Sequence, residues 1–413
     1  MESYKVAGID VHKKMLAVVI ADAGARGEFR FERRKFGTLD SDLKQLAQYL
    51  TAHGVQEVVM ESTAQYWKPV WRELEPHCKL HLAQAQSNRA PRGRKRDFTD
   101  AERLVRRHIA GELILSFVPD PEQRLWRTVT RSKNQLTEER VRLRNQMESL
   151  LEDARIKLAN CVSDLLGLSS RRMMRALADG ESNPETLAKL ADKALRATPE
   201  QLADALAAAP QLSELHRQIL GLFLDRVELM DRQIHILDQA LAVCLEPHHP
   251  AVVRLSQAPG WGVDSAQQVI AEIGPTAATF ASAEELASWV GCCPGREESA
   301  EQSKSNRCPK GNRQMRRVLT QVAQGAVKTK GSVFQRLYDR LVRKKGHGKA
   351  MWAVVHRVCR LAWKILHQGV RYEERGLLPH PKLAKQRTAK LVRQLKRLGY
   401  NVQLTPLATA PQF

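Results

Sequence analysis

The chain lacks any run of about 18 consecutive apolar residues, so no membrane-spanning helix is expected. Its first ten residues, MESYKVAGID, are typical of a short strand and not of a secretory signal, which needs a charged start followed by an apolar core. It also lacks a lipidation motif and a long internal repeat. These absences argue against a membrane partner.

Paired cysteines are also lacking. The seven cysteines are odd in number and scattered, at positions 78, 161, 244, 292, 293, 308 and 359, and form no Cys-x-x-Cys motif. This usage favours reduced thiols in a reducing compartment over a disulfide framework. Cys292, Cys293 and Cys308 lie close together in sequence, but no histidine has matching spacing, so plain thiols are favoured over a structural zinc site.

Acidic residues are too few to balance the basic ones. Lysine and arginine total 66 against 45 acidic residues, which gives a formal net charge of +21. Such an excess predicts a polyanionic partner, because neutralising phosphates releases counterions and gives affinity without sequence preference. Charge alone fits a basic binding protein without chemistry equally well, and an anionic membrane surface less well.

The N-terminal third alternates strands with helices. Apolar runs predict strands at 4–9, 15–21, 28–36, 58–60 and 79–83, and helical spacing predicts helices at 40–52, 65–76 and 97–110. The resulting order of three strands, helix, strand, helix, strand, helix is that of the ribonuclease-H-like fold.

The rest of the chain is predicted to be helical. Apolar residues at heptad-like spacing in 120–156 and 213–244 indicate two long helices, either as an antiparallel coiled-coil hairpin or as a subunit interface. We therefore predict an α/β plus α protein with four parts: a ribonuclease-H-like domain at 1–119, a coiled-coil and short-helix domain at 120–245, a mainly helical domain at 246–375 and a basic extension at 376–413.

Four carboxylates occupy positions that this fold would bring together. Asp10 ends the first strand, Glu61 ends the fourth, and Asp97 and Asp100 lie on one face at the start of a helix. Neighbouring carboxylates repel one another, and hard divalent cations, Mg²⁺ first and Mn²⁺ as an alternative, relieve that repulsion. Taken singly, each residue is better explained as a turn former or a first-turn helix acid. Taken together, they predict a site for phosphoryl transfer.

A basic run precedes the helical pair of acids. Its cations Arg92, Arg94, Lys95 and Arg96 are candidates for holding DNA phosphates beside the acids. His12 and His81 also lie near the predicted site in sequence, but a surface or core role is the better interpretation for each.

Several motifs carry a family resemblance. GIDVHKK surrounds Asp10, MESTAQYWKPV surrounds Glu61 and KRDFTDAERL holds Asp97 and Asp100, while APGWGVDSAQQVIAEIG, FASAEELASWVGCCPG and CPKGNRQMRRVL follow in 258–319. In this order the chain resembles the DEDD-type insertion-sequence transposases, which are recombinases guided by a bridge RNA. The resemblance implies a RuvC-like N-terminal domain, a second domain with a serine nucleophile, and action in the bacterial cytoplasm at the nucleoid.

The resemblance also implies which serine attacks DNA. Ser299, in Glu298-Ser299, matches best, and Ser303 and Ser305 are close competitors. By composition alone, the stretch ESAEQSKSN indicates an ordinary polar loop, and Ala300 stands where the family has glycine. The predicted catalytic set is therefore Asp10, Glu61, Asp97, Asp100 and Ser299.

Further nucleic-acid contacts are predicted in the C-terminal part. Gly260 and Gly262 form a Gly-x-Gly turn that either approaches a phosphate or serves only as a tight helix–helix turn. The candidate phosphate-binding cations near Ser299 are Arg307, Lys310, Arg313, Arg316 and Arg317.

The sequence thus favours a transposase that cuts and rejoins DNA with Mg²⁺ and a serine. The resemblance implies donor and target DNA, a structured guide RNA and a homo-oligomer, either dimer or tetramer, as partners. The first alternative is a metal-dependent Holliday-junction resolvase or nuclease without a serine intermediate. The second is a basic binding protein or repressor without catalytic activity.

Overall fold

The computed structural model describes residues 4–23, 29–61, 64–85, 97–293, 297–299, 302–305, 308–374, 381–397 and 400–404. The chain divides into two compact units, Met1–Asp120 and Pro121–Phe413. Each unit has its own core, and each is described by itself. Within the described residues, no helix is long and apolar enough to cross a membrane.

A five-stranded sheet forms the centre of the first unit. Its strands are β1 (Tyr4–Val11), β2 (Leu16–Ala23), β3 (Phe29–Phe36), β4 (Glu57–Glu61) and β5 (Lys79–Ala83), and its helices are α1 (Asp40–Ala52), α2 (Trp67–Leu74) and α3 (Asp97–Ile109). The strand order is β3-β2-β1-β4-β5, with β2 antiparallel to its neighbours and β1, β4 and β5 parallel. This mixed sheet is consistent with the expected ribonuclease-H-like domain.

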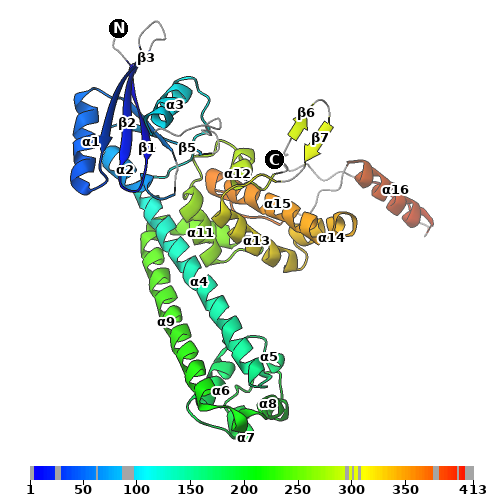
Figure 1. Cartoon of the computed structure of the whole chain (residues 1–413). Coiled ribbons are helices and arrows are strands. Elements are labelled where there is room, and N and C mark those ends of the chain that lie inside the picture. Colours follow the sequence, from blue (N-terminus) through cyan, green and yellow to red (C-terminus); the bar gives the residue numbers. More distant parts are fainter. Residues whose placement is uncertain are drawn as a thin grey trace. The chain divides into compact units, whose positions relative to one another are not determined.

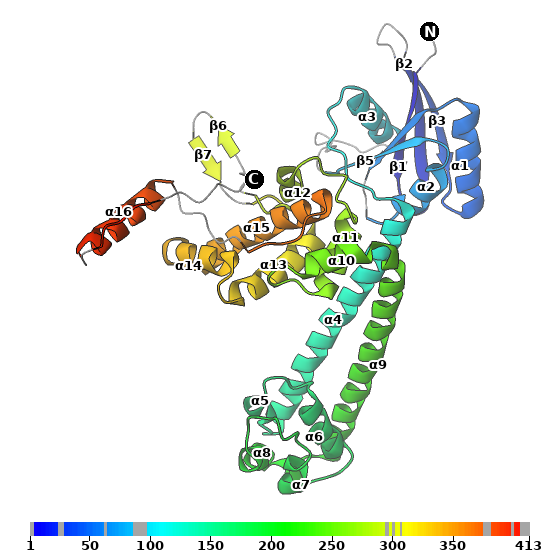
Figure 2. The same cartoon turned by 180° about the vertical axis from the view of Figure 1, so that it is seen from behind.

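The two faces of the sheet are covered by different helices (Figures 1 and 2). Val58 and Met60 point to the face that α1 and α2 cover, where they join the larger apolar core. Val59 points the other way and packs with Leu104 and Val105 of α3. This alternation follows from the two-residue period of a strand, and it places Glu57 and Glu61 on the α3 face as well.

A pair of long helices dominates the second unit. α4 (Pro121–Asp153) and α9 (Glu214–Cys244) lie side by side in both views of the fold (Figures 1 and 2). A shared core joins them to the short helices α5 (Leu158–Cys161), α6 (Leu168–Ala178), α7 (Pro184–Ala188) and α8 (Pro199–Ala205). At the start of α8, the Thr198 hydroxyl accepts a hydrogen bond from the Gln201 backbone N–H, and the Gln201 side chain accepts one from the Thr198 backbone N–H, so the two residues form a capping box.

The remainder of this unit is mainly helical. It comprises α10 (His249–Ser256), α11 (Val263–Ile273), α12 (Ala283–Val290), the strands β6 (Glu297–Ser299) and β7 (Gln302–Ser305), α13 (Arg313–Lys328), α14 (Val333–Lys345), α15 (His347–Gln368) and α16 (Pro381–Arg397). Helix α4 is fixed to α11 and α13 through Glu272, which is almost fully buried. Arg131 pairs with both Glu272 carboxylate oxygens at 2.9 and 3.0 Å, and Asn312 donates to Glu272 Oε2 at 3.0 Å. These bonds hold the N-terminal part of α4 against α11 and the start of α13.

Candidate active site

Two of the predicted acids end neighbouring parallel strands. The register pairs Ile9 of β1 with Met60 of β4, so the next positions along these strands are Asp10 and Glu61. Burial raises the pKa of Asp10, and the negative charges of Asp100 and Glu61 raise it further, while His12 opposes the shift. A carboxylate that resists ionisation for these reasons is one whose charge a bound cation would compensate.

The other two acids come from the first turn of α3. That helix packs closely on β1, because Gly8 leaves room: a Cβ atom there would stand 2.4 Å from the Ala101 carbonyl oxygen. The N-terminal end of α3 therefore lies over the end of β1, where Asp97 and Asp100 approach Asp10. The structure thus brings together the four acids that the sequence singled out.

His12 lies among the acids, although the sequence favoured a surface or core role for it. Its Nε2 is 3.0 Å from Asp10 Oδ2 and 3.7 Å from Asp97 Oδ1, and about half of its side chain is exposed. One potential ligand atom from each of these three residues lies within 4.8 Å of the others. No spacing rule identifies a lone histidine as part of an acid site. Only the position of His12, two residues beyond Asp10, could have indicated that it lies there.

Two cations complete the site. Lys35 Nζ lies 3.3 Å from Asp97 Oδ2, and Arg103 Nη2 donates to Asp100 Oδ1 at 2.7 Å. Both pairs reduce repulsion among the acids. The carboxylate oxygens suit a hard divalent ion.

The basic run before α3 lies outside the described residues. This applies to Arg92, Arg94, Lys95 and Arg96, and in the second unit to Arg307. Their expected phosphate contacts stay predictions.

All three candidate serines belong to one pair of short antiparallel strands. Ser299 of β6 pairs with Gln302 of β7, and Ser303 and Ser305 pair with Glu298 and Glu297. Composition had indicated a loop here. The side chains of this segment lie outside what the structure describes, so the choice among the serines stays a prediction.

The Gly-x-Gly turn packs against the protein itself. Gly260 has a φ of +81°, and a Cβ there would stand 2.2 Å from the Val322 carbonyl oxygen of α13. Packing therefore accounts for Gly260 as a tight helix–helix turn. Around Gly262 there is open space, with nothing within 4 Å of an added Cβ.

The predicted phosphate-binding cations differ in exposure and in their contacts within the protein. Arg316 donates to the carbonyl oxygens of Gly291 and Pro309 at 3.2 and 2.9 Å and lies over the Trp352 ring. Arg317 is half-buried, which lowers the pKa of its guanidinium, and it hydrogen-bonds Gln268. Lys310 and Arg313 are exposed. The exposed pair are therefore the better candidates for holding a phosphate.

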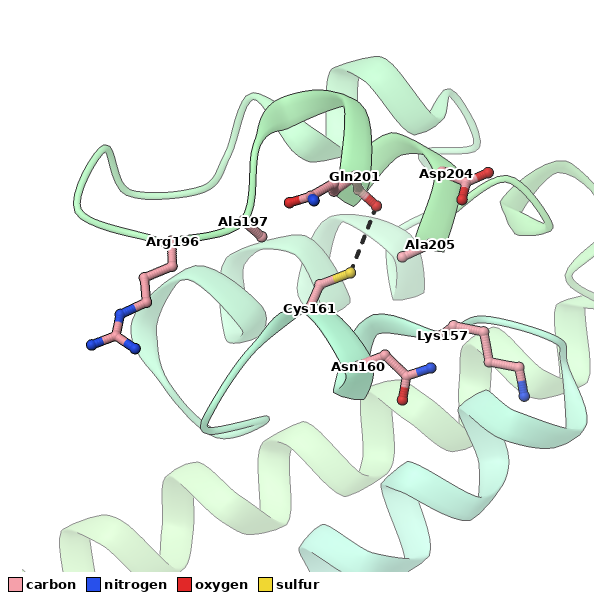
Figure 3. Close-up of a pocket in the computed structure, with 8 residues that line it drawn as sticks. All are labelled: Lys157, Asn160, Cys161, Arg196, Ala197, Gln201, Asp204 and Ala205. Atoms are coloured by element: carbon pink, nitrogen blue, oxygen red, sulfur yellow. Dashed lines mark hydrogen bonds between the residues drawn. The ribbon is translucent and has the colours of Figure 1, made fainter.

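A separate hollow lies among the short helices beyond the ends of α4 and α9. It has a volume of about 540 Å³ and is lined by Lys157, Asn160, Cys161, Arg196, Ala197, Gln201, Asp204 and Ala205. In Figure 3 the Cys161 thiol points to the Gln201 carbonyl oxygen, to which it donates at 3.6 Å. With one carboxylate and no paired acid and base, this lining offers no comparable chemistry.

Comparison with known proteins agrees with both halves of this description. A family model for DEDD-type IS110 transposases, described as "Transposase", matches residues 7–156, which include all four acids. A second model, described as "Transposase IS116/IS110/IS902 family", matches residues 253–339, which include β6 and β7. No curated protein matches the chain. The DEDD domain implies a divalent metal ion, and the chain belongs to the IS110 family of DEDD-type transposases and is a DNA transposase.

Proposed function

We propose that this transposase cuts and rejoins DNA at the acid site of its first unit, with Mg²⁺ as the natural ion and Mn²⁺ as a substitute. The observation that carries the proposal is the convergence of Asp10, Glu61, Asp97 and Asp100 at one edge of the sheet. In such a site, divalent ions supply electrostatic stabilisation of the attacking and leaving oxygens during in-line phosphoryl transfer.

The chain's own residues prepare this site. Asp10 and Glu61 are fixed by the strands, and Asp97 and Asp100 by a helix that cannot shift without losing its contact with Gly8. Lys35 Nζ lies at the exposed side of the cluster, where it can hydrogen-bond a phosphate oxygen. We infer that this cation orients the scissile phosphate over the acids. The arrangement supports the RuvC-like assignment of this domain.

Substitution of single acids tests this function. Asp10→Asn and Glu61→Gln should each lower the cleavage rate by at least about 100-fold while DNA binding is retained, because ion binding depends on their charge. Asp40→Asn is the matched control, since Asp40 is exposed on α1, where it pairs with Lys44 of the same helix. Unchanged cleavage by both acid variants would exclude the proposal and favour a binding protein without catalysis.

For the second unit, we propose Ser299 as the nucleophile that forms a transient phosphoserine bond to DNA. The support is its match to the family motif and its place on the β6–β7 strand pair within the region that the transposase model matches. In this step the Ser299 hydroxyl oxygen bonds to phosphorus, its proton passes to solvent or a base, and the 3′ or 5′ oxygen of the DNA leaves.

Three serine variants separate this proposal from its rivals. Ser299→Ala should abolish the covalent protein–DNA adduct on denaturing gels, whereas Ser303→Ala and Ser305→Ala should retain it. Loss of the adduct in one of the control variants instead would move the role to that serine. Cutting that survives Ser299→Ala, with no adduct in any variant, would indicate a resolvase-like reaction with water as the nucleophile.

A guide RNA is proposed as a further partner, beside donor and target DNA. The support is the family resemblance together with the net charge of +21, which fits more than one polyanion. Sequencing of RNA that co-purifies with the protein tests this. One discrete structured RNA is expected, and bulk cellular RNA alone would contradict it.

Self-association is proposed to use the outer face of α9. Five apolar residues there recur every seven positions and are 46–76% exposed: Leu215, Leu222, Leu229, Ile236 and Val243. A seven-residue apolar repeat drifts only about 20° per heptad around a straight helix, so this row remains on nearly one face. It is the pattern with which a helix packs along a partner helix.

Charge placed in that row should break the oligomer. The double variant Leu222→Lys/Ile236→Lys should reduce the mass measured by light scattering to that of one chain, without lowering the unfolding temperature. His235→Lys/Ala242→Lys, on exposed positions about 100° around the same helix from the row, is the control. An unchanged mass in the first variant would exclude this face.

A further inference from the structure

The α3 face of the sheet carries a second polar cluster at the end away from the acids. Glu57 begins β4, His81 lies on β5, and His108 is in the last turn of α3. The apolar residues Val59 and Leu104 lie on the stretch of this face that separates the two clusters. From Asp100 to His108 the helix rises about 12 Å, so the second cluster is separate from the acid site.

The two imidazoles meet at one carboxylate oxygen. His81 Nε2 and His108 Nε2 are each 2.9 Å from Glu57 Oε2, and their ring centroids are 4.4 Å apart. One ligand atom from each of the three residues lies within 4.8 Å of the others. Each of the three side chains is only 13–16% exposed. Such closeness of two imidazoles and a carboxylate across three separate elements is not produced by neighbouring positions in sequence.

Other residues hold Glu57 in this orientation. Lys79 Nζ donates to its second oxygen, Oε1, at 2.9 Å, and the Tyr4 hydroxyl hydrogen-bonds the same carboxylate. These contacts leave Oε2 directed at the imidazoles. Outer partners that fix a ligand in this way, here Lys79 and Tyr4 on Glu57, are typical of metal sites.

We propose that Glu57, His81 and His108 bind one transition-metal ion, with Zn²⁺ as the best fit, at a structural site distinct from the catalytic acids. Imidazole nitrogen suits Zn²⁺, whereas Mg²⁺ prefers oxygen alone. Bonds of about 2.0–2.1 Å to a tetrahedral ion place neighbouring ligand atoms about 3.3 Å apart. The two nitrogen–oxygen distances of 2.9 Å need only small side-chain movements to reach that spacing.

The ion would act by holding the C-terminal end of α3 against β4 and β5. The same helix carries Asp97 and Asp100 at its other end, so the site would fix the helix that supplies half of the catalytic acids. The rival account is a hydrogen-bonded cluster without an ion, in which both Nε2 atoms carry protons and donate to Glu57. The two accounts differ in what a glutamine should do, because its amide donates a similar hydrogen bond but is a poor metal ligand.

Zinc titration of the full-length protein tests the proposal. The chain would carry Asp10→Asn and Asp97→Asn, which remove the acid cluster as a competing site, and would be stripped with a chelator before titration. This parent chain is expected to bind one Zn²⁺ ion at the site. Either His81→Gln or His108→Gln should lower the affinity of the site for Zn²⁺ by at least about 100-fold. His53→Gln is the matched control, because His53 is also partly buried and near a single glutamate, Glu32, at 3.3 Å.

Two readouts on the parent chain stay informative even where a glutamine variant fails to fold. Zn²⁺ should raise the unfolding temperature. Co²⁺ in its place should give visible ligand-field absorption without the strong near-ultraviolet band of a thiolate–cobalt bond, which separates this site from the cysteines. No zinc-dependent rise in unfolding temperature, equal binding by the glutamine variants, or a thiolate band would each overturn the proposal.

Discussion

Asp10 combines burial with two nearby negative charges, and this combination has an energetic consequence. Its pKa is raised above the ordinary value of 3.8 by burial, then by Asp100 and Glu61. A carboxyl whose folded-state pKa is raised destabilises the fold at any pH where it is ionised, and this effect disappears once the pH falls to the ordinary value. The ionised acid site therefore lowers the free energy of unfolding.

The variant Asp10→Asn should accordingly be more stable than the wild type at neutral pH, although it is inactive. Asparagine keeps an oxygen that accepts the hydrogen bond from His12 and removes the charge. The gain in unfolding temperature should shrink as the pH is lowered from about 7 to about 4, where Asp10 becomes protonated. Thermal unfolding in metal-free buffer measures this.

Added Mg²⁺ provides the internal check on the same variant. The wild type should gain stability from the ion and the variant should gain less, because one ligand is missing. Asp40→Asn should behave like the wild type throughout. A lower unfolding temperature for Asp10→Asn at neutral pH would contradict this account.

Between elements, α3 approaches β1 closely at Gly8. Gly8→Ala would place a Cβ 2.4 Å from the Ala101 carbonyl oxygen and 2.7 Å from Val105 Cγ2, and the helix backbone would have to move. Overpacking of this kind costs about 1–3 kcal/mol of unfolding free energy. Cleavage should fall as well, because Asp97 and Asp100 move with the helix. Urea unfolding and a cleavage assay measure the two effects.

Gly348→Ala is the matched control for that change. An added Cβ at Gly348, near the start of α15, meets nothing within 4 Å, so the variant should be neutral or more stable by up to about 1 kcal/mol. Equal effects of the two substitutions would mean that α3 can shift without strain.

In the second unit, the buried Glu272 of α11 links that helix to α4. Glu272→Ala leaves Arg127 and Arg131 of α4 without their carboxylate, and removing one partner of a buried ion pair costs about 3–5 kcal/mol. Glu284→Ala removes an exposed carboxylate paired with Arg360 and should cost less than about 1 kcal/mol. Urea unfolding of both variants gives the comparison, and similar values would contradict a structural role for Glu272.

The helices and strands could be predicted from sequence better than the contacts between them. Strand alternation and helical spacing identify the sheet and α3, and the parallel pairing of β1 with β4 follows from the fold, so Asp10 and Glu61 could be placed together. The cluster of Glu57, His81 and His108 could not, because its members come from three elements and no local pattern marks them. Arg316 and Arg313 are alike in sequence, and the contacts of Arg316 with Gly291, Pro309 and Trp352 separate them.

For the whole molecule, the excess of 66 basic over 45 acidic residues governs how nucleic acid is held, whereas the acid site governs what is done to it. Nucleic-acid binding and cleavage should therefore be separable by experiment. Binding to non-specific DNA should survive a chelator and the Asp10→Asn change. The binding affinity should fall by about 10³–10⁵-fold between 50 and 200 mM salt for a protein that contacts about 6–10 phosphates.

Substitution of single cations measures how much each contributes to DNA binding. Arg313→Gln should weaken DNA binding and reduce the slope of log affinity against log salt by about 1, with no change in unfolding temperature, because Arg313 is exposed and can hold a phosphate. Arg316→Gln should lower the unfolding temperature instead, because its guanidinium is bound to Gly291 and Pro309 within the protein. Fluorescence anisotropy over a salt series, with thermal unfolding of both variants, measures this. The reverse pattern would assign Arg316 to the nucleic-acid interface and Arg313 to the fold.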